Sequence, residues 1–204
     1  MRSIVLLVEK LAYYDEHGFS RGLAAKYAKH LRGTVLDGGT GGFGRLCPWL
    51  DVHGIDNDAG ALRVASQYET TTLADISTGR LPYADESFDS VLCKDILEHL
   101  PEPWLLVSDI KRVLRDGGAI VASTVQARPR RVWADYTHIR GFTAEAFRLM
   151  FEDAGFCVGG VTPMGGVPLS DRLRFVHLLP YLLRAPPFSA LWASSWELVA
   201  KKAS

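Results

Sequence analysis

Hydrophobic residues along this chain fall into short uninterrupted runs, separated by longer stretches in which apolar positions recur every three or four residues. A short β-branched or apolar run is typical of a parallel strand that is buried on both faces. Seven such runs predict strands, at residues 34–37, 52–56, 70–73, 90–94, 119–124, 156–161 and 196–201.

The stretches with helical spacing predict helices over residues 59–67, 104–114 and 143–154, and two more over 3–14 and 18–30. Asp58 and Thr143 precede two of these stretches, and both residue types are suitable N-caps. In the helix over 104–114, we expect one face to be buried, formed by Leu105, Ile110, Val113 and Leu114.

This alternation of strands and helices predicts βαβ units with right-handed crossovers. The chain is therefore expected to form an α/β fold on a parallel sheet, which binds its ligands at the carboxyl edge of the strands. Two segments break the alternation. Residues 125–141 are basic and aromatic and follow the fifth strand at that edge, and residues 163–193 are unusually apolar.

Composition narrows the class of protein. The chain has 204 residues, 48% of them hydrophobic, and its 23 basic side chains balance its 23 acidic ones. This neutral balance argues against binding to a nucleic-acid backbone, which favours a basic excess. Cys47, Cys93 and Cys157 are widely spaced and predict reduced, mostly buried thiols, so we expect a cytoplasmic protein. No apolar run reaches the roughly 18 residues that a membrane-spanning helix needs.

The glycine-rich stretch VLDGGTGGFGRL, residues 35–46, is the first candidate for ligand binding. Gly39, Gly41 and Gly44 fit the weak GxGxxG pattern of dinucleotide-binding proteins. Asp37 disagrees with that pattern, because its carboxylate would repel a pyrophosphate a few ångströms away. A nucleoside with an amino-acid tail fits better, since its ammonium group suits Asp37 and its ribose suits Asp56. S-adenosylmethionine is such a molecule.

Six ordered blocks of this sequence resemble the class I S-adenosylmethionine-dependent methyltransferases, in particular the small-molecule branch called methyltransferase type 11. The blocks are VLDGGTGGFG, HGIDND, TLADIS, LPYADESFDSVLCKDILEHL, VLRDGGAIVAST and DYTHIRGFTAEAFRLMFEDAGF. The resemblance covers roughly residues 30–161 and includes the last strand. It implies a Rossmann-like, doubly wound sheet of seven strands, mostly parallel with an antiparallel last strand, with helices on both faces.

The resemblance also implies roles for residues around the methionine part of the cofactor. Asp37 would face the ammonium group, directly or through water. Gly39 and Gly41 would let the backbone approach the methionine part. Lys94 would lend its carbonyl oxygen to the ammonium group.

Four further residues would contact the nucleoside part of the cofactor. Asp56 would accept hydrogen bonds from the ribose hydroxyls, and Asn57 would lie beside the adenine. Asp75 would bind the adenine amino group, with the Ile76 backbone beside it. The sequence departs from the family pattern at Phe43, where the third alternating glycine is usual.

The acceptor half is less defined. His138, in the aromatic and basic segment, and His99 are candidate catalytic residues, although either histidine could make a structural hydrogen bond instead. The basic cluster at 128–131 suits a solvated loop or an acidic substrate. No histidine or carboxylate spacing indicates a metal, so none is expected.

We expect a single domain, with helices over 1–32, a cofactor-binding core over 33–161, a helical insertion or cap over 162–195 and a last strand over 196–204. The apolar stretch 168–192 suits a packed cap or an oligomer interface better than a membrane-contacting helix, because basic residues interrupt it.

The leading hypothesis is methyl transfer to an oxygen or carbon of a small, lipophilic acceptor. A non-catalytic, S-adenosylmethionine-binding partner subunit and a dinucleotide-dependent oxidoreductase are the alternatives.

Overall fold

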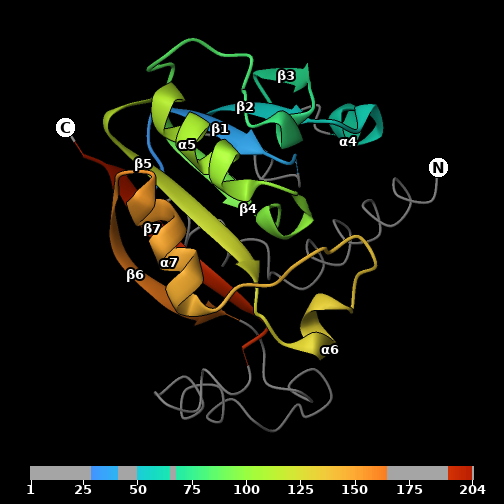
Figure 1. The fold of residues 1–204 in the computed structure, drawn as a ribbon. Helices are drawn as coiled ribbons and strands as arrows, with labels where there is room; N and C mark the ends of the chain where they lie inside the picture. Colours follow the sequence, from blue (N-terminus) through green and yellow to red (C-terminus); the bar gives the residue numbers. More distant parts are fainter. Residues whose placement is uncertain (1–28, 41–49, 65–67, 165–192, 204) are drawn as a thin grey trace, which may run out of the picture.

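The computed structural model describes residues 29–40, 50–64, 68–164 and 193–203. Within them, seven strands form one sheet in the order β3-β2-β1-β4-β5-β7-β6 (Figure 1). The strands are β1 (Thr34–Gly38), β2 (Asp51–Asp56), β3 (Thr70–Leu73), β4 (Phe88–Lys94), β5 (Leu114–Val125), β6 (Phe156–Met164) and β7 (Ser195–Lys202).

The sheet is parallel from β3 to β5, and β7 is antiparallel to both of its neighbours, β5 and β6. This arrangement confirms the predicted Rossmann-like sheet with an antiparallel last strand. The strand order reverses between β1 and β4, so the sheet has its switch point there. In open α/β sheets ligands bind outside the carboxyl ends of the strands at this point.

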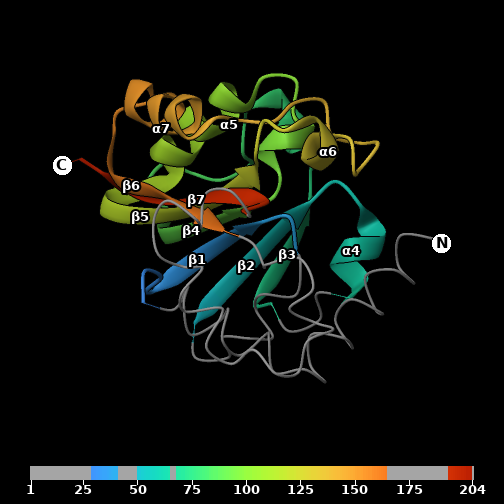
Figure 2. The ribbon, with the colours of Figure 1, turned by 90° about the horizontal axis from the view of Figure 1, so that it is seen from below.

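The helical elements are α4 (Ala59–Val64), η1 (Ile76–Thr78), η2 (Leu97–His99), α5 (Pro103–Val113), α6 (Pro129–Val132) and α7 (Ala144–Asp153). Helices α5 and α7 lie side by side on one face of the sheet (Figure 2). The predicted caps are present: Thr143 Oγ1 accepts a hydrogen bond from the Ala146 N–H at 3.1 Å, and Asp58 accepts one from the Gly60 N–H at 2.7 Å.

One prediction about α5 is wrong. Leu105 is 39% exposed, whereas Leu106, Val107, Ile110 and Val113 form the buried face. Leu106, Ile110 and Val113 are spaced by four and three residues and so share one face of the helix, whereas Leu105 precedes Ile110 by five residues and lies off that face. A second prediction fails at Cys157, which is exposed, while Cys93 is buried as expected.

Both faces of the central strands are buried. Leu36, Val91 and Ile120 pack into the larger core beneath α5 and α7. Their neighbours Val35, Leu92 and Val121 point to the opposite face and form a second cluster with Leu31, Val52 and Tyr68. This alternation explains why the strands read as continuous apolar runs in the sequence.

The helix expected over residues 3–14, the apolar stretch 168–192 and all but the last two residues of the helix expected over 18–30 lie outside the described residues, so helices on both faces stay a prediction. Residues 29 and 30 form a turn. None of the helices in the described ranges is both long and apolar enough to cross a membrane.

Candidate functional site

The candidate site lies at the carboxyl edge of the sheet, where β1, β2 and β4 end. Asp37 is the fourth residue of β1, Asp56 is the last of β2 and Lys94 is the last of β4. Parallel pairing of these strands brings their carboxyl ends to one edge. Three of the predicted cofactor-binding residues are thus grouped at the switch point.

Asp37 has an incomplete hydrogen-bond environment. Its side chain is 1% exposed, and the Tyr68 hydroxyl donates a hydrogen bond to Oδ2. Oδ1 is buried and has no hydrogen-bond donor among the described residues. Burial raises the pKa of Asp37 to about 7, although the Tyr68 hydrogen bond and the Lys94 charge oppose this rise. A cationic ligand beside Oδ1 would satisfy the carboxylate, as the ammonium group of S-adenosylmethionine would.

Gly39 occupies a conformation that favours glycine. Its φ is 91°, and its N–H donates a hydrogen bond to the Ile55 carbonyl at 2.8 Å. A Cβ at this position would lie 2.6 Å from Ile96 Cδ1. The close approach of backbone to ligand that was predicted here therefore needs this glycine. The predicted partner Gly41 and the irregular Phe43 lie outside the described residues.

Asp56 faces the same loop from β2. The Thr40 N–H and hydroxyl lie 3.3 and 3.4 Å from its Oδ2, and Oδ1 accepts from the Asp58 N–H at 2.9 Å. The carboxylate is thereby held at the strand end, and its partly exposed position suits ribose hydroxyls. Asn57 is exposed beside it.

Asp75 has a structural role in addition to the predicted one. It is the N-cap of η1, and its Oδ1 accepts a hydrogen bond from the Ser77 N–H at 2.8 Å. This hydrogen bonding to Ser77 lowers the pKa of Asp75. Ile76, which follows, is 8% exposed. Contacts of Asp75 and the Ile76 backbone with adenine stay predictions.

Lys94 places its side chain against the next residue. Its Nζ lies 2.6 Å from Asp95 Oδ2, and Ser123 donates a hydrogen bond to Asp95 Oδ1 at 2.8 Å. Asp95 has a φ of 53°, so the chain turns sharply at the end of β4 before it enters η2. The contact of the Lys94 carbonyl with the cofactor stays a prediction.

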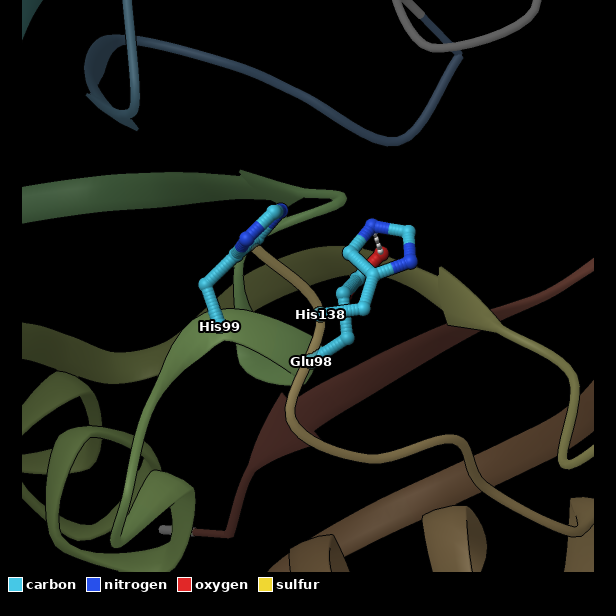
Figure 3. A group of neighbouring side chains, drawn as sticks. All are labelled: Glu98, His99 and His138. Atoms are coloured by element: carbon cyan, nitrogen blue, oxygen red, sulfur yellow. Dashed lines mark ion pairs between the residues drawn. The ribbon is translucent and has the colours of Figure 1, made fainter. Parts of the chain in front are cut away.

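The two candidate catalytic histidines come together beyond β4. His99 ends η2, and His138 lies in the segment after β5 (Figure 3). Their ring centroids are 4.6 Å apart, and His138 Nε2 lies 4.0 Å from Oε1 of Glu98, which is 1% exposed. One ligand atom of each residue falls within 4.8 Å of the others. Glu98 was not among the candidate catalytic residues predicted from the sequence, and no metal was expected.

The segment that carries His138 is tied to the sheet at both ends. The Ala127 N–H donates to the Phe142 carbonyl at 2.8 Å, and the Phe142 N–H donates to the Val125 carbonyl at 3.0 Å. The Ile139 N–H donates to the Glu98 carbonyl at 3.0 Å and holds the segment over η2.

Hydrogen bonds fix the orientation of both rings. His138 Nδ1 lies 2.9 Å from the Val132 carbonyl, so this nitrogen is the donor. Thr137 Oγ1 donates to Asp135 Oδ1 at 2.6 Å and therefore accepts from His99 Nδ1 at 3.0 Å. In the neutral form of each ring, this arrangement leaves a free lone pair on the other nitrogen, Nε2.

Burial shifts the pKa of two of the three residues in the cluster. It raises the pKa of the Glu98 carboxyl, and the charge of Asp95 adds to this effect. It lowers the pKa of the His99 imidazole, and the neighbouring His138 acts in the same direction. Three large apolar side chains in the same segment as His138 are exposed: Trp133 is 67%, Tyr136 96% and Ile139 49% exposed.

Comparison with known proteins decides which cofactor this edge serves. A family model described as a methyltransferase domain matches residues 36–122, from β1 into β5. An uncharacterized methyltransferase of Mycobacterium avium is 36% identical over 104 residues, which cover 47% of this chain and 41% of that protein. Residues 36–122 thus match a methyltransferase domain, and the comparisons support the resemblance to the class I S-adenosylmethionine-dependent methyltransferases.

Other relatives agree with this assignment. A ubiquinone biosynthesis O-methyltransferase of Acinetobacter baylyi is 30% identical over 133 residues, 59% of this chain and 52% of that protein. A solved S-adenosylmethionine-dependent methyltransferase of Archaeoglobus fulgidus has the same fold, with a TM-score of 0.72 at 16% identity, over 95% of this chain and 99% of that one. This chain spans about half the length of the curated relatives it matches.

The family uses S-adenosylmethionine, so this cofactor prediction is confirmed and the dinucleotide alternative is set aside. The buried, unsatisfied Asp37 and the glycine-dependent turn at Gly39 fit the ammonium group and the methionine backbone of that molecule.

Proposed function

We propose that this methyltransferase transfers a methyl group from S-adenosylmethionine to a hydroxyl oxygen of a small, largely apolar acceptor. The observation that carries the proposal is the cluster of Glu98, His99 and His138 beside the carboxyl edge that Asp37 and Asp56 share. A hydroxyl group must lose its proton when it is methylated, and groups with free lone pairs at the acceptor position suit that requirement.

The cofactor half follows from the end of each strand. Asp37 at β1 holds the ammonium group, and Asp56 at β2 holds the ribose hydroxyls. The methionine backbone passes over Gly39. Farther along the edge, Asn57, Asp75 and Ile76 contact the adenine, and the carbonyl of Lys94 completes the ammonium site.

The acceptor half is the segment between β5 and α7. Trp133 and Tyr136 expose large aromatic surfaces next to His138, so this segment offers apolar contacts to a planar ring. Curated relatives named as ubiquinone biosynthesis O-methyltransferases, 29–33% identical, support a hydroxylated aromatic ring as the acceptor.

S-adenosylmethionine supplies a methyl group that its sulfonium already activates. The bond from the methyl carbon to sulfur breaks, its electron pair stays on sulfur, and a bond from that carbon to the acceptor oxygen forms. The protein therefore contributes mainly by alignment, which can supply several kcal/mol of the barrier. His99 and His138 act on the acceptor hydroxyl through their free Nε2 atoms.

The proposal is tested with S-adenosylmethionine that carries a deuterated methyl group and a panel of mono- and dihydroxylated aromatic acceptors, with and without apolar tails. Product is followed by mass spectrometry for the wild type, Asp56→Ala and Asp51→Ala. Asp51 begins β2 at the opposite, amino-terminal edge, so it is a matched carboxylate on the same strand.

We expect a singly methylated phenolic product from the wild type and Asp51→Ala, and a large loss with Asp56→Ala. A fully active Asp56→Ala would refute the site. Methylation at carbon in place of oxygen would refute the acceptor chemistry.

A further inference from the structure

We propose that Glu98, His99 and His138 hold a divalent transition-metal ion that binds the hydroxyl group of the acceptor. This inference rests on the proposed function, because it assigns the cluster its part in the same methyl transfer. It replaces the expectation from the sequence that the protein has no metal site.

The three side chains approach one another without bonding to one another. Their ligand atoms lie within 4.8 Å, but His138 Nε2 is 4.0 Å from Glu98 Oε1, beyond the range of a hydrogen bond. Figure 3 shows both rings directed toward the same space above Glu98. Donor atoms that are close but not bonded leave room for a shared ligand between them.

Each of the three residues also has its second polar atom tied down. The Nδ1 of His138 donates to the Val132 carbonyl, and that of His99 donates to Thr137, which in turn donates to Asp135. Glu98 Oε2 accepts a hydrogen bond from Thr124 Oγ1 at 2.9 Å, which leaves Oε1 for the cluster. Metal-binding histidines typically donate their other N–H to a carbonyl or a carboxylate-linked group in this way.

A simple ion pair between Glu98 and a protonated His138 explains the cluster less well. Such a pair in a buried site needs a direct, charge-assisted hydrogen bond, which at 4.0 Å is not formed.

The ligand set indicates the class of metal. Two imidazole nitrogens and one carboxylate oxygen suit Zn²⁺, Co²⁺, Mn²⁺ or Fe²⁺ better than Mg²⁺ or Ca²⁺, which prefer oxygen ligands. Three protein ligands leave coordination positions open, as in catalytic metal sites. The acceptor oxygen would take one of these positions, so that the Nε2 atoms of His99 and His138 act on its hydroxyl through the metal. The hydroxyl would release its proton to solvent, and its oxygen would then form the bond to the methyl carbon. No electron leaves or enters the metal.

The test is titration of metal-free, full-length protein with Co²⁺, followed by its visible absorption and by calorimetry. Two variants remove ligands while they keep side-chain shape: the double variant His99→Asn/His138→Asn, and Glu98→Gln. The matched control is His53→Asn, because His53 also lies near a carboxylate, Asp51, but on β2 away from the cluster. Circular dichroism establishes that each variant is folded.

We expect one equivalent of Co²⁺ to bind the wild type and His53→Asn, with at least about tenfold weaker binding in both cluster variants. Chelation should abolish methyl transfer, and Co²⁺ or Zn²⁺ should restore it. Absence of saturable binding to the folded wild type, or equal binding in the double variant, would overturn the inference.

Binding of S-adenosylhomocysteine, measured in parallel, separates this inference from the proposed function. If the cofactor product binds and phenolic acceptors are methylated after chelation, only the metal proposal falls. If the protein binds Co²⁺ at the cluster but neither binds the cofactor product nor methylates any acceptor, the proposed function falls.

Discussion

Replacement of Asp37 by asparagine tests how the site recognises the cofactor, because it removes the charge and keeps the shape. Asp37 is buried, its Oδ1 has no donor among the described residues, and burial raises its pKa to about 7. The ammonium group of S-adenosylhomocysteine favours the ionised carboxylate. Binding of that ligand therefore requires Asp37 to lose a proton that it holds at acidic pH in the free protein.

The expected size follows from the titration of a single group. With a pKa of about 7, the carboxyl is roughly one-tenth ionised at pH 6 and roughly nine-tenths ionised at pH 8. The Kd for S-adenosylhomocysteine should consequently fall about tenfold between these values, which corresponds to about 1.4 kcal/mol. Asp37→Asn should bind more weakly at pH 8, and its Kd should stay nearly constant over the range.

The stability of the ligand-free protein should move in the opposite direction. The folded pKa of Asp37 lies above that of the unfolded chain, about 3.9. The unfolded chain therefore loses this proton first as pH rises, and the contribution of Asp37 to the free energy of unfolding decreases from about pH 4 to pH 7. Asp37→Asn should remove this decrease and unfold at higher temperature than the wild type at pH 8.

The assays are calorimetry with S-adenosylhomocysteine from pH 6 to pH 8 and thermal unfolding over the same range. Asp75→Asn is the control, because the pKa of the exposed Asp75 is lowered and its charge is constant in this window. An Asp37→Asn variant with the same pH slope as the wild type would show that another group controls binding.

Three further predictions concern stability, the loop and the acceptor. Asp109 is 8% exposed and accepts hydrogen bonds from the Leu81 N–H at 2.7 Å and from the Arg112 Nε at 2.6 Å. Asp109→Ala should therefore lower the free energy of unfolding by about 2–4 kcal/mol in chemical denaturation, whereas removal of the exposed Glu145 should have no measurable effect. Equal effects of the two substitutions would contradict the stabilising role of the Asp109 hydrogen bonds. Gly39→Ala should lower the free energy of unfolding by about 1–2 kcal/mol and weaken S-adenosylhomocysteine binding in calorimetry, because the positive φ of Gly39 disfavours alanine even where Ile96 moves aside. Unchanged affinity would show that the turn is not part of the site. Trp133→Ala should raise the KM for the acceptor severalfold in steady-state kinetics and leave cofactor-product affinity unchanged; an effect on the cofactor side alone would remove the aromatic segment from the acceptor site.

Local patterns in the sequence predicted the strands, and the family resemblance supplied the antiparallel last strand and the candidate cofactor-binding residues. The strands are short apolar runs because both of their faces are buried, and the carboxylates that follow two of them, Asp56 and Asp75, are marked by position alone. Errors arose where tertiary packing decides. Strand β5 begins at Leu114 and not at 119, since pairing with Phe88 extends it through the two glycines.

The acceptor side could not be derived in this way, because its residues meet only in the folded chain. Glu98 and His138 are 40 positions apart, and the Ile139 N–H bond to the Glu98 carbonyl brings them together. No spacing rule for metal ligands connects them. Tyr68 likewise reaches Asp37 from the far end of the crossover that follows β2. The nearest signal was Glu98, the acidic residue directly before His99, which was not among the candidate residues predicted from the sequence.

The most direct test of the central claim is the transfer of a deuterated methyl group to a phenolic acceptor by the wild type and by Asp37→Asn at pH 8. We expect the wild type to form a product in which one trideuteromethyl group replaces a hydroxyl hydrogen, and Asp37→Asn to form it far more slowly at cofactor concentrations below saturation. Equal rates for the two proteins, or no oxygen-methylated product from any acceptor, would contradict the account.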